Sequence, residues 1–372
     1  MARVLLKNVT KTYDGDVRAV DNATLEVGDQ EFMVIVGPSG CGKTTTLRLI
    51  AGLEEPTSGE IAIGGRAVNG IPPNDRHLAM VFQNYALYPH MTAFQNMAFG
   101  LKLRKYSKDE IARRVKAVAE LLDINDILNR KPQTLSGGQR QRIALGRAVV
   151  GQPQVFLFDE PLSNLDARSR IATRAELKAI HSQVDATSIY VTHDQTEAMS
   201  LGDRIAVMYK GALLQVGEPM QVYKKPANRF IASFISTSAV NFCSGTIQSK
   251  NNTLHFVSGQ MDIAITDRRM ESAVARYGKR EVVLGIRPEH VSFKPSAEKD
   301  ITVIRGTVTM MEHFGDHEIA YFRDTSDRMW VVKVEADTGV QVNEPAAICL
   351  DLGKIHLFEP GETGANIGIA YD

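Results

Sequence analysis

One glycine-rich segment, set between an apolar run and a helical pattern, constrains the fold of this chain more than any other feature. Gly37-Pro-Ser-Gly-Cys-Gly-Lys-Thr44 follows the apolar run Val34–Val36 and precedes the helical run Thr45–Ile50, as the eight-position phosphate-loop pattern requires. Its glycines permit a tight turn whose N–H groups point at phosphates, and the new helix adds its positive dipole end. A chance glycine-rich turn would not need both flanks. The sequence therefore predicts a phosphate-loop α/β domain that binds a nucleotide.

Side chains in this loop have separate expected roles. We expect the ammonium of Lys43 to reach the outer phosphates and the hydroxyl of Thr44 to ligate magnesium. Cys41 lies at a helix N-terminus, which favours the thiolate, so we expect it to react with thiol reagents unless burial prevents this. The expected nucleotide contacts in this segment are Ser39, Gly40, Cys41, Gly42, Lys43, Thr44 and Thr45.

The pattern of the 372-residue chain changes near residue 235. Before that point, apolar runs such as Val155–Phe158 and Thr187–Val191 alternate with helical patterns such as Ser107–Leu122, which predicts a parallel sheet packed by helices. We expect a phosphate-loop NTPase domain over 1–235, with a helical subdomain at about 86–150, and a mostly β domain over 236–372. The strands predicted in the second domain are Leu254–Val257, Glu281–Gly285, Ile301–Val308 and Ala346–Leu350.

Composition limits the compartment and the partners. Lys plus Arg and Asp plus Glu both number 43, so no bulk positive charge favours a nucleic-acid partner, although a local basic patch stays possible. Three scattered cysteines make neither a disulfide framework nor a zinc pattern, and they indicate a reducing compartment. We find no secretory signal and no apolar run long enough to span a bilayer, so any membrane role is expected to be peripheral.

Two carboxylates follow the apolar run Val155–Phe158. Ligands bind at the carboxyl ends of parallel strands, so Asp159 and Glu160 should lie beside the phosphate loop. We expect Asp159 to hold magnesium, directly or through water, and Glu160 to orient and deprotonate the attacking water. An Asp-Glu pair alone is equally consistent with a favourable helix N-terminus, and it is the phosphate loop that makes the catalytic interpretation the stronger one.

A second candidate anion site opens the helical run Arg140–Val150. The turn Leu135-Ser136-Gly137-Gly138-Gln139 presents free N–H groups and a hydroxyl at a helix N-terminus. Ser and Gly are also favoured as plain helix caps, which is the alternative interpretation. The position of the turn upstream of Asp159 favours nucleotide contact. The residues expected to make this contact are Ser136, Gly137, Gly138 and Gln139.

The order of these motifs resembles the ATP-binding cassette family of ATPases. The order is the phosphate loop, Gln83, Leu-Ser-Gly-Gly-Gln, Asp159-Glu160 and then His193. The resemblance implies ATP and Mg²⁺ as cofactors, and it implies that Gln83 touches both the metal and the water and links the nucleotide to a membrane partner. It also implies that His193 contacts the γ-phosphate. The residues it assigns to catalysis are Lys43, Gln83, Glu160 and His193, and those it assigns to the metal are Thr44, Gln83 and Asp159.

Two further nucleotide contacts come only from the resemblance. Ser163-Asn-Leu-Asp166 is similar to the loop that communicates across the dimer, which assigns Asp166, and Tyr13 matches the aromatic residue on which adenine stacks. Without the resemblance, Gln83, His193 and Tyr13 would each be given a simpler role. A lone glutamine is usually solvated, a lone histidine is usually structural and a lone tyrosine is usually part of a core.

Other segments resemble the subfamily that energises maltose-type carbohydrate uptake. They are Tyr88-Pro-His-Met91, Gly285-Ile-Arg-Pro-Glu-His290 and Ile355-His356-Leu357-Phe358. The resemblance implies a C-terminal β-barrel of the oligonucleotide/oligosaccharide-binding (OB) type that serves regulation and dimer contacts. From the residues alone, Arg287 to His290 are also consistent with a turn of solvated charges.

The segment 85–91, directly after Gln83, is more apolar than an ordinary exposed loop. Exposed apolar patches often mark protein partners, and the resemblance assigns this segment to a groove that receives a short cytoplasmic helix from each permease. The alternative is that its side chains pack in the core of the helical subdomain itself.

The resemblance implies the ATP-hydrolysing subunit of a carbohydrate importer. It would be a homodimer, peripheral on the cytoplasmic face of the inner membrane, with two integral-membrane permease partners and, indirectly, an extracytoplasmic solute-binding protein. ATP binding would close the dimer and hydrolysis would reopen it, driving alternating access. The alternatives are a soluble nucleic-acid-associated cassette ATPase and a non-catalytic nucleotide-sensing regulator. The sequence shows no inserted coiled coil, zinc module or second cassette, and Glu160 and His193 are both present.

Overall fold

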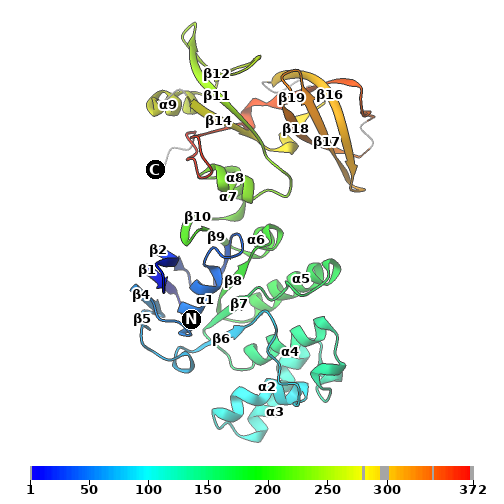
Figure 1. Ribbon diagram of the computed structural model, residues 1–372. Coiled ribbons are helices and arrows are strands. Elements are labelled where there is room, and N and C mark those ends of the chain that lie inside the picture. The colour runs from blue at the N-terminus through cyan, green and yellow to red at the C-terminus, as the bar shows by residue number, and fades with distance from the viewer. Residues whose placement is uncertain (1, 279–280, 294–300, 337–338, 369–372) are drawn as a thin grey trace. The chain divides into compact units, whose positions relative to one another are not determined.

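The computed structural model describes residues 2–278, 281–293, 301–336 and 339–368 (Figure 1). The chain divides into two compact units, Met1–Met220 and Gln221–Asp372. This division falls before the expected boundary at residue 235, so that the short helix α8 (Arg229–Phe234) and most of α7 (Pro219–Lys224) belong to the second unit. Among the described residues, no helix is both long and apolar enough to cross a bilayer.

The first unit is built on a six-stranded sheet in the order β10-β9-β3-β8-β7-β6. Every neighbouring pair is parallel except the antiparallel pair β9 and β10. All five residues of β3 are buried, as expected for an apolar strand in the middle of a parallel sheet. The strands are β3 (Phe32–Val36), β6 (Leu78–Val81), β7 (Val155–Asp159), β8 (Thr187–Thr192), β9 (Arg204–Tyr209) and β10 (Ala212–Gly217).

A second, antiparallel sheet of the first unit has the order β2-β1-β4-β5. One apolar core joins it to the parallel sheet: Leu6 of β1, Ile35 of β3 and Leu47 of the helix α1 (Lys43–Ala51) are all fully buried in the same cluster. The helix that follows the phosphate loop is therefore held between the two sheets. The strands are β1 (Val4–Tyr13), β2 (Val17–Val27), β4 (Ser58–Ile63) and β5 (Arg66–Ala67).

Three helices form a group beside β6 and fall within the expected span 86–150 (Figure 1). The amphipathic helix predicted over Ser107–Leu122 is confirmed: Ser107 caps it by accepting from the N–H of Glu110 at 3.2 Å, and Ile111 and Val115 are buried. The helices of the unit are α2 (Ala93–Leu103), α3 (Lys108–Leu121), α4 (Gly137–Val149), α5 (Ala167–Gln183) and α6 (Gln195–Leu201), in addition to α1.

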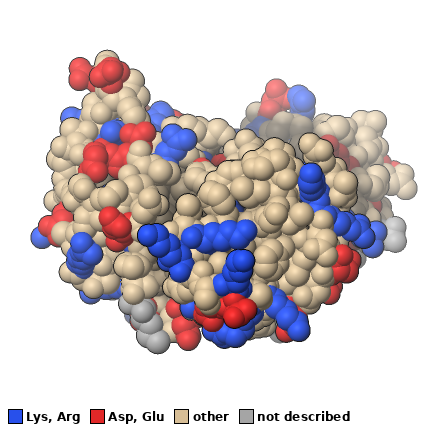
Figure 2. Space-filling view, turned by 90° about the horizontal axis from the view of Figure 1, so that it is seen from below, with Lys and Arg blue, Asp and Glu red and all other residues tan. Residues whose placement is uncertain are grey.

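Although the net charge of the chain is zero, basic side chains cluster locally on its surface. Figure 2 shows Lys and Arg side chains gathered across one face, with Asp and Glu among them and at its edges. On α2, α3 and the loop between them the exposed basic residues are Lys102, Arg104, Lys105, Lys108, Arg113 and Lys116. Glu110 binds Arg113 at 2.7 Å and Arg114 at 2.6 Å, so part of this charge is neutralised internally. The local basic patch that the composition left possible is therefore present on α2, α3 and the loop between them.

The second unit is mostly β, as predicted. Its two antiparallel five-stranded sheets, β13-β12-β11-β14-β20 and β15-β19-β16-β17-β18, share one core that contains Phe256, Phe322 and Trp330. The four strands predicted from the sequence are confirmed as β12 (Thr253–Ser258), β14 (Glu281–Ile286), β16 (Ile301–His313) and β19 (Pro345–Asp351). The other elements are β11 (Asn241–Lys250), β13 (Met261–Ala264), α9 (Arg268–Tyr277), β15 (Val291–Ser292), β17 (His317–Asp324), β18 (Met329–Glu335) and β20 (His356–Phe358).

Arg287 is buried, so the interpretation of its segment as a turn of solvated charges is wrong for Arg287, while Glu289 in the same segment is exposed. Its guanidinium is 3.8 Å from the ring centroid of Tyr223 and donates to the carbonyls of Ile235, at 2.9 Å, and Tyr223, at 3.0 Å. Burial lowers the pKa of Arg287. Arg287 therefore fixes the segment that contains α7 and α8 onto the sheets of the second unit.

The second unit is expected to lose stability in acid through His356. Burial, with Arg287, His290 and Lys354 nearby, lowers the pKa of His356 to about 4, and Asn366 donates to its Nδ1 at 3.3 Å. Because the unfolded imidazole titrates near 6.5, the unfolded state binds more protons between these values, and stability falls as the pH drops through this window. We expect about 2 kcal/mol to be lost between pH 7 and pH 5.

Urea unfolding of this unit at pH 7 and at pH 5 measures the effect of His356. The variant His356→Gln, which carries no titrating ring, should show a smaller loss between the two pH values than the natural chain. Equal losses in both proteins would exclude His356 as the cause.

Candidate active site

The glycine-rich loop wraps around the ammonium of Lys43. Lys43 Nζ donates to the carbonyls of Gly37, at 2.9 Å, and Pro38, at 2.8 Å, and the side chain is 4% exposed. Gly42 has φ +107°, and a Cβ on it would lie 2.0 Å from the carbonyl oxygen of Ala19. Only glycine fits so close to this carbonyl, so the backbone geometry of the loop requires glycine at this position. The loop joins β3 to α1, as predicted.

Thr44 and Asp159 bring two oxygen atoms together next to the loop. Thr44 Oγ1, in the first turn of α1, donates to Asp159 Oδ1, at the end of β7, over 2.9 Å. Burial raises the pKa of Asp159, and the hydrogen bond from Thr44 opposes this rise. A hydroxyl and a carboxylate at a partly buried position fit a hard cation such as Mg²⁺, whose charge would favour the ionised carboxylate.

One carboxylate, that of Glu160, faces both Lys43 and His193. Its Oε2 is 2.9 Å from His193 Nδ1, and its Oε1 is 4.0 Å from Lys43 Nζ. Glu160 has φ +45°, a left-handed conformation that is uncommon for a residue with a side chain, and its N–H donates to the carbonyl of Val191 at 3.0 Å. Such backbone strain is typical of functional positions, and here it aims the carboxylate at the loop.

Gln83 lies at the same sheet edge, just after β6, and is exposed. Its carbonyl accepts from Asn164 Nδ2 at 3.0 Å. Asn164 belongs to the segment between Glu160 and α5, so the residues after β6 are tied to those after β7. The structure therefore brings Lys43, Thr44, Asp159, Glu160, His193 and Gln83 to one edge of the parallel sheet.

Sequence reasoning missed Arg147, which lies on α4. Its Nη2 donates to the carbonyl of Tyr85 at 2.8 Å and its Nη1 to that of Ala86 at 2.6 Å. Tyr85 and Ala86 both have positive φ, +58° and +43°, so the guanidinium binds a strained turn directly after Gln83. The sequence contains no signal for this contact, because the acceptors are backbone carbonyls and every residue carries one.

Part of the apolar segment 85–91 packs in the unit's own core, and part of it is exposed as expected for a docking surface. Tyr85 is 7% exposed, which agrees with packing in the unit itself. Ala86 is exposed, and Tyr88 is 36% exposed although its ring is 4.8 Å from that of Phe99 on α2. Ala86 and Tyr88 thus leave an accessible apolar surface beside Gln83.

The Leu-Ser-Gly-Gly-Gln turn lies at the start of α4. Ser136 Oγ accepts from the N–H of Gln139 at 3.3 Å, and Gln139 Oε1 accepts from the N–H of Ser136 at 3.0 Å, which makes a capping box. Ser136 is exposed, and Gly137 and Gly138 form the first two residues of the helix. In the described part of the chain no hydrogen bond or ion pair joins these residues to Lys43. The nucleotide contact expected of these residues therefore stays a prediction.

The other residues expected to contact the nucleotide lie on α5, β1, α1 and the tip of the glycine-rich loop. Asp166 caps α5 by accepting from the N–H of Ser169 at 3.0 Å and from its hydroxyl at 2.6 Å, and these hydrogen bonds lower the pKa of Asp166. Tyr13, at the end of β1, is 39% exposed with Lys11 Nζ 5.0 Å from its ring centroid. Thr45 is half-buried in the first turn of α1. Ser39 and Gly40, at the tip of the glycine-rich loop, are exposed.

The expectation of a reactive thiolate at Cys41 is wrong. Cys41 is 4% exposed within the apolar core, and burial raises the pKa of its thiol, outweighing the nearby ammonium of Lys43. A raised pKa and low exposure both slow reaction with thiol reagents. We now expect native protein to keep its ATPase activity through brief alkylation, with modification of all three buried cysteines only after unfolding in urea. Peptide mass spectrometry measures this, and rapid loss of activity with label on Cys41 would contradict it.

Family profiles match three stretches of the chain. The ABC transporter profile matches residues 20–163, the MalK OB fold domain matches residues 239–291 and the TOBE domain matches residues 284–358. The trehalose/maltose import ATP-binding protein MalK of Thermococcus litoralis is 48% identical over 368 residues, which cover 96% of this chain and 98% of that protein. The chain belongs to the ABC transporter ATPases. Within them it has the C-terminal OB and TOBE domains of the MalK-type subfamily, which confirms the resemblance drawn from the motifs.

Two further relatives and one solved structure also match this ABC ATPase. The sn-glycerol-3-phosphate import ATP-binding protein UgpC of Escherichia coli K12 is 45% identical over 99% of this chain and all of that protein. The ABC transporter ATP-binding protein YurJ of Bacillus subtilis is 44% identical over 96% of this chain and 98% of that protein. The dimeric structure of the bacterial ABC cassette MJ0796 matches with a TM-score of 0.53 at 33% identity, covering 58% of this chain and 98% of that chain.

Proposed function

We propose that this chain is the ATP-hydrolysing subunit of a carbohydrate importer, bound peripherally at the cytoplasmic face of the inner membrane. The observation that carries the proposal is the position of Glu160 between His193 and Lys43, next to the oxygen pair of Thr44 and Asp159. Full-length relatives that are import ATP-binding proteins, for trehalose/maltose and for sn-glycerol 3-phosphate, support the transport role.

Each residue of the cluster has its own role in hydrolysis. Lys43 leaves the carbonyls of its own loop and binds the outer phosphates, where it offsets developing negative charge. Glu160 orients a water molecule and accepts its proton as the water oxygen attacks the γ-phosphorus, so that ADP leaves with its electron pair. His193 donates to the γ-phosphate, and Gln83 touches the same water. Bound Mg²⁺, held by Thr44, Asp159 and Gln83, supplies charge neutralisation at the phosphates.

The working form is a homodimer in which each site is completed by the other chain. At the start of α4, Ser136 is exposed and Gly137 to Gln139 are half-buried, and no described hydrogen bond joins them to Lys43 of their own chain. A two-fold arrangement would place them on the partner's nucleotide. Asp166 would lie at this interface, and Tyr13 would stack on adenine. ATP binding closes the dimer and hydrolysis reopens it, and this movement drives alternating access in two permease subunits served by an extracytoplasmic solute-binding protein.

Reconstitution tests the proposal. The chain is co-expressed with a candidate pair of permeases, and ATP-dependent uptake of trehalose, maltose and sn-glycerol 3-phosphate into proteoliposomes is measured. The solute-binding protein is added inside or outside the vesicles. We expect uptake of one of these solutes, with ATPase activity stimulated by the loaded binding protein. A chain that hydrolyses ATP but assembles with no permease would overturn the transport role.

A further inference from the structure

A polar cavity of about 360 Å³ lies in the second unit, far along the sequence from the phosphate loop. Three segments form it: the β12–β13 turn at 258–262, the start of β16 at 302–305 and the β17–β18 turn at 324–328. The β12–β13 turn belongs to one sheet of the unit, and the other two segments belong to its other sheet. The volume is at the lower end of the range for small-molecule sites, which suits a metabolite rather than a macromolecule.

The carboxylates of the cavity already have protein partners. Asp324 accepts from the N–H groups of Ser326, at 2.8 Å, and Arg328, at 3.0 Å, and from Trp330 Nε1 at 3.0 Å. Asp262 binds Lys250 at 2.6 Å and His255 at 2.7 Å, and these contacts lower the pKa of Asp262. Neither carboxylate is available as the main ligand of a cation.

The guanidinium groups of the cavity, in contrast, keep donors available. Arg328 is half-buried, and its Nη2 donates to the neutral hydroxyl of Ser258 at 2.9 Å. Within the described ranges, neither Arg328 nor Arg305 forms an ion pair. A guanidinium has five N–H donors, so most of those on Arg328 are free for a ligand. Lys250 neutralises Asp262, whereas Asp324, bound by neutral N–H groups, keeps its negative charge. The two guanidinium groups exceed this one remaining carboxylate, so the net charge of the cavity is positive and favours an anion.

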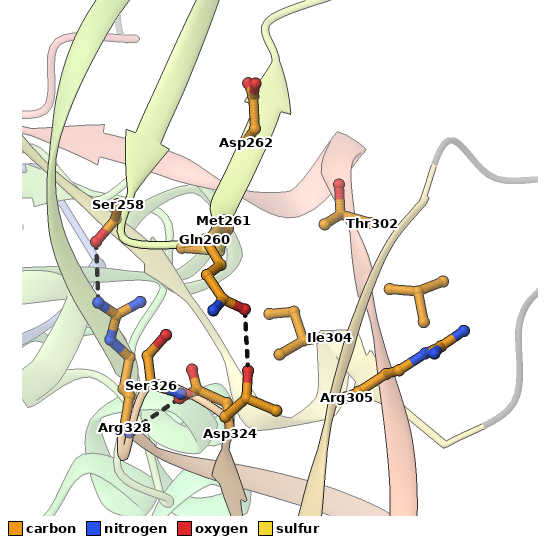
Figure 3. A pocket seen from close by; sticks show the side chains of 12 residues that line it. Ser258, Gln260, Met261, Asp262, Thr302, Ile304, Arg305, Asp324, Ser326 and Arg328 are labelled. Atoms are coloured by element: carbon orange, nitrogen blue, oxygen red, sulfur yellow. Dashed lines mark hydrogen bonds between the residues drawn. The ribbon is translucent and has the colours of Figure 1, made fainter.

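Between the two arginines the lining is made of groups that recognise hydroxyls. Figure 3 shows Gln260 between Arg328 and Arg305. The hydroxyl of Thr325 donates to Gln260 Oε1 at 3.4 Å. Ser326 and Thr302 add hydroxyls, while Met261 and Ile304 supply apolar contacts. No aromatic ring is among the described lining residues, so a nucleobase would find nothing to stack on. The set suits a small anion that also carries several hydroxyls.

We infer that this cavity binds a phosphorylated sugar or polyol, with Arg328 on the phosphate and with Gln260 and Thr325 on the hydroxyls. Such a ligand would join the β12–β13 turn of one sheet to the β17–β18 turn of the other. Its binding would therefore stabilise the second unit, because any ligand specific for the folded state raises the free energy of unfolding.

Titration calorimetry of the full chain with glucose 6-phosphate tests this inference. We expect saturable binding with one site per chain, weakened about 10-fold or more by Arg328→Ala, since a charge-assisted hydrogen bond is lost. Gln260→Ala, in an exposed turn, tests the hydroxyl contacts without risk to the fold. Arg323→Ala is the matched control, because Arg323 lies close by on β17 but binds Asp327 at 2.7 Å and does not line the cavity.

Further titrations distinguish binding in this cavity from binding at the glycine-rich loop, and distinguish recognition of the whole ligand from recognition of its phosphate alone. Binding must survive Lys43→Ala, because a phosphate held by the glycine-rich loop would be lost in that variant. Inorganic phosphate and glucose are titrated separately, and both should bind more weakly than glucose 6-phosphate. Absence of binding, equal affinity for inorganic phosphate, or full affinity in both Arg328→Ala and Gln260→Ala would overturn the inference, while the ATPase and transport proposals would stand.

Discussion

Replacement of Glu160 by Gln is expected to lower ATP hydrolysis by about 10²- to 10⁴-fold while ATP binding is retained. The carboxylate is 2.9 Å from His193 Nδ1 and 4.0 Å from Lys43 Nζ, so it is held where the phosphates and the water would meet. An amide keeps the size and the hydrogen-bonding reach of the side chain but cannot accept the proton of the attacking water. In the proposed cycle hydrolysis reopens the dimer, so the variant should also accumulate as a closed dimer.

Single-turnover hydrolysis and size-exclusion chromatography with ATP and Mg²⁺ measure the two expected effects of Glu160→Gln. Glu120→Gln is the matched control, because Glu120 is exposed on α3 and the same change there should leave both rates and elution unaltered. Near-normal hydrolysis by Glu160→Gln would remove this residue from its role as the general base. Loss of ATP binding would instead assign it to the nucleotide pocket.

The parts of the site that the sequence predicted are those with a local signature. The strand, loop and helix around Lys43 follow from glycines whose backbone angles only glycine adopts easily, such as Gly42 at φ +107°. Asp159 and Glu160 follow from the rule that ligands bind at the carboxyl ends of parallel strands. Both signals are contained in a few consecutive residues. The contacts that join α1, β7 and His193 agree with the expected positions of these residues, and their roles stay predictions.

Contacts to backbone carbonyls were not predictable. Arg147 binds the carbonyls of Tyr85 and Ala86, and Asn164 binds that of Gln83, each across more than sixty residues of sequence. A carbonyl has no residue-specific signature, so only the folded backbone shows which ones face a donor. These contacts nevertheless link α4 and the segment after Glu160 to the residues after β6.

Cys41 illustrates why burial was harder to predict than position. The sequence places it correctly at the N-terminus of α1, where the helix dipole favours a thiolate. Its exposure depends on residues distant in the sequence, since Met208 of β9 belongs to the same buried cluster. Desolvation disfavours the charged form and raises the pKa of the thiol, so packing outweighs the dipole.

The second large effect is expected at Ala86, where substitution by Lys should abolish assembly with the permeases while the free subunit still hydrolyses ATP. Ala86 is exposed, and its carbonyl rather than its side chain accepts from Arg147 at 2.6 Å. Alanine and lysine both carry a Cβ, so the positive φ of +43° costs them similarly and the turn is retained. An ammonium placed in an apolar docking surface would lose hydration without gaining a partner, which strongly disfavours the complex.

Co-purification with the permeases and ATPase activity of the free subunit must be measured together to test Ala86→Lys. Ala112→Lys provides the matched control, because Ala112 is exposed on α3 and the same change there should affect neither measurement. Ala86 is a sharper test than Leu87, which is half-buried, because lysine at Leu87 would also disturb packing. If Ala86→Lys leaves both co-purification and uptake intact, the permeases dock elsewhere, and the link from Gln83 to transport through this exposed turn is lost. If it abolishes the ATPase of the free subunit as well, the turn serves the nucleotide site itself, through Gln83 and Arg147, rather than the permeases.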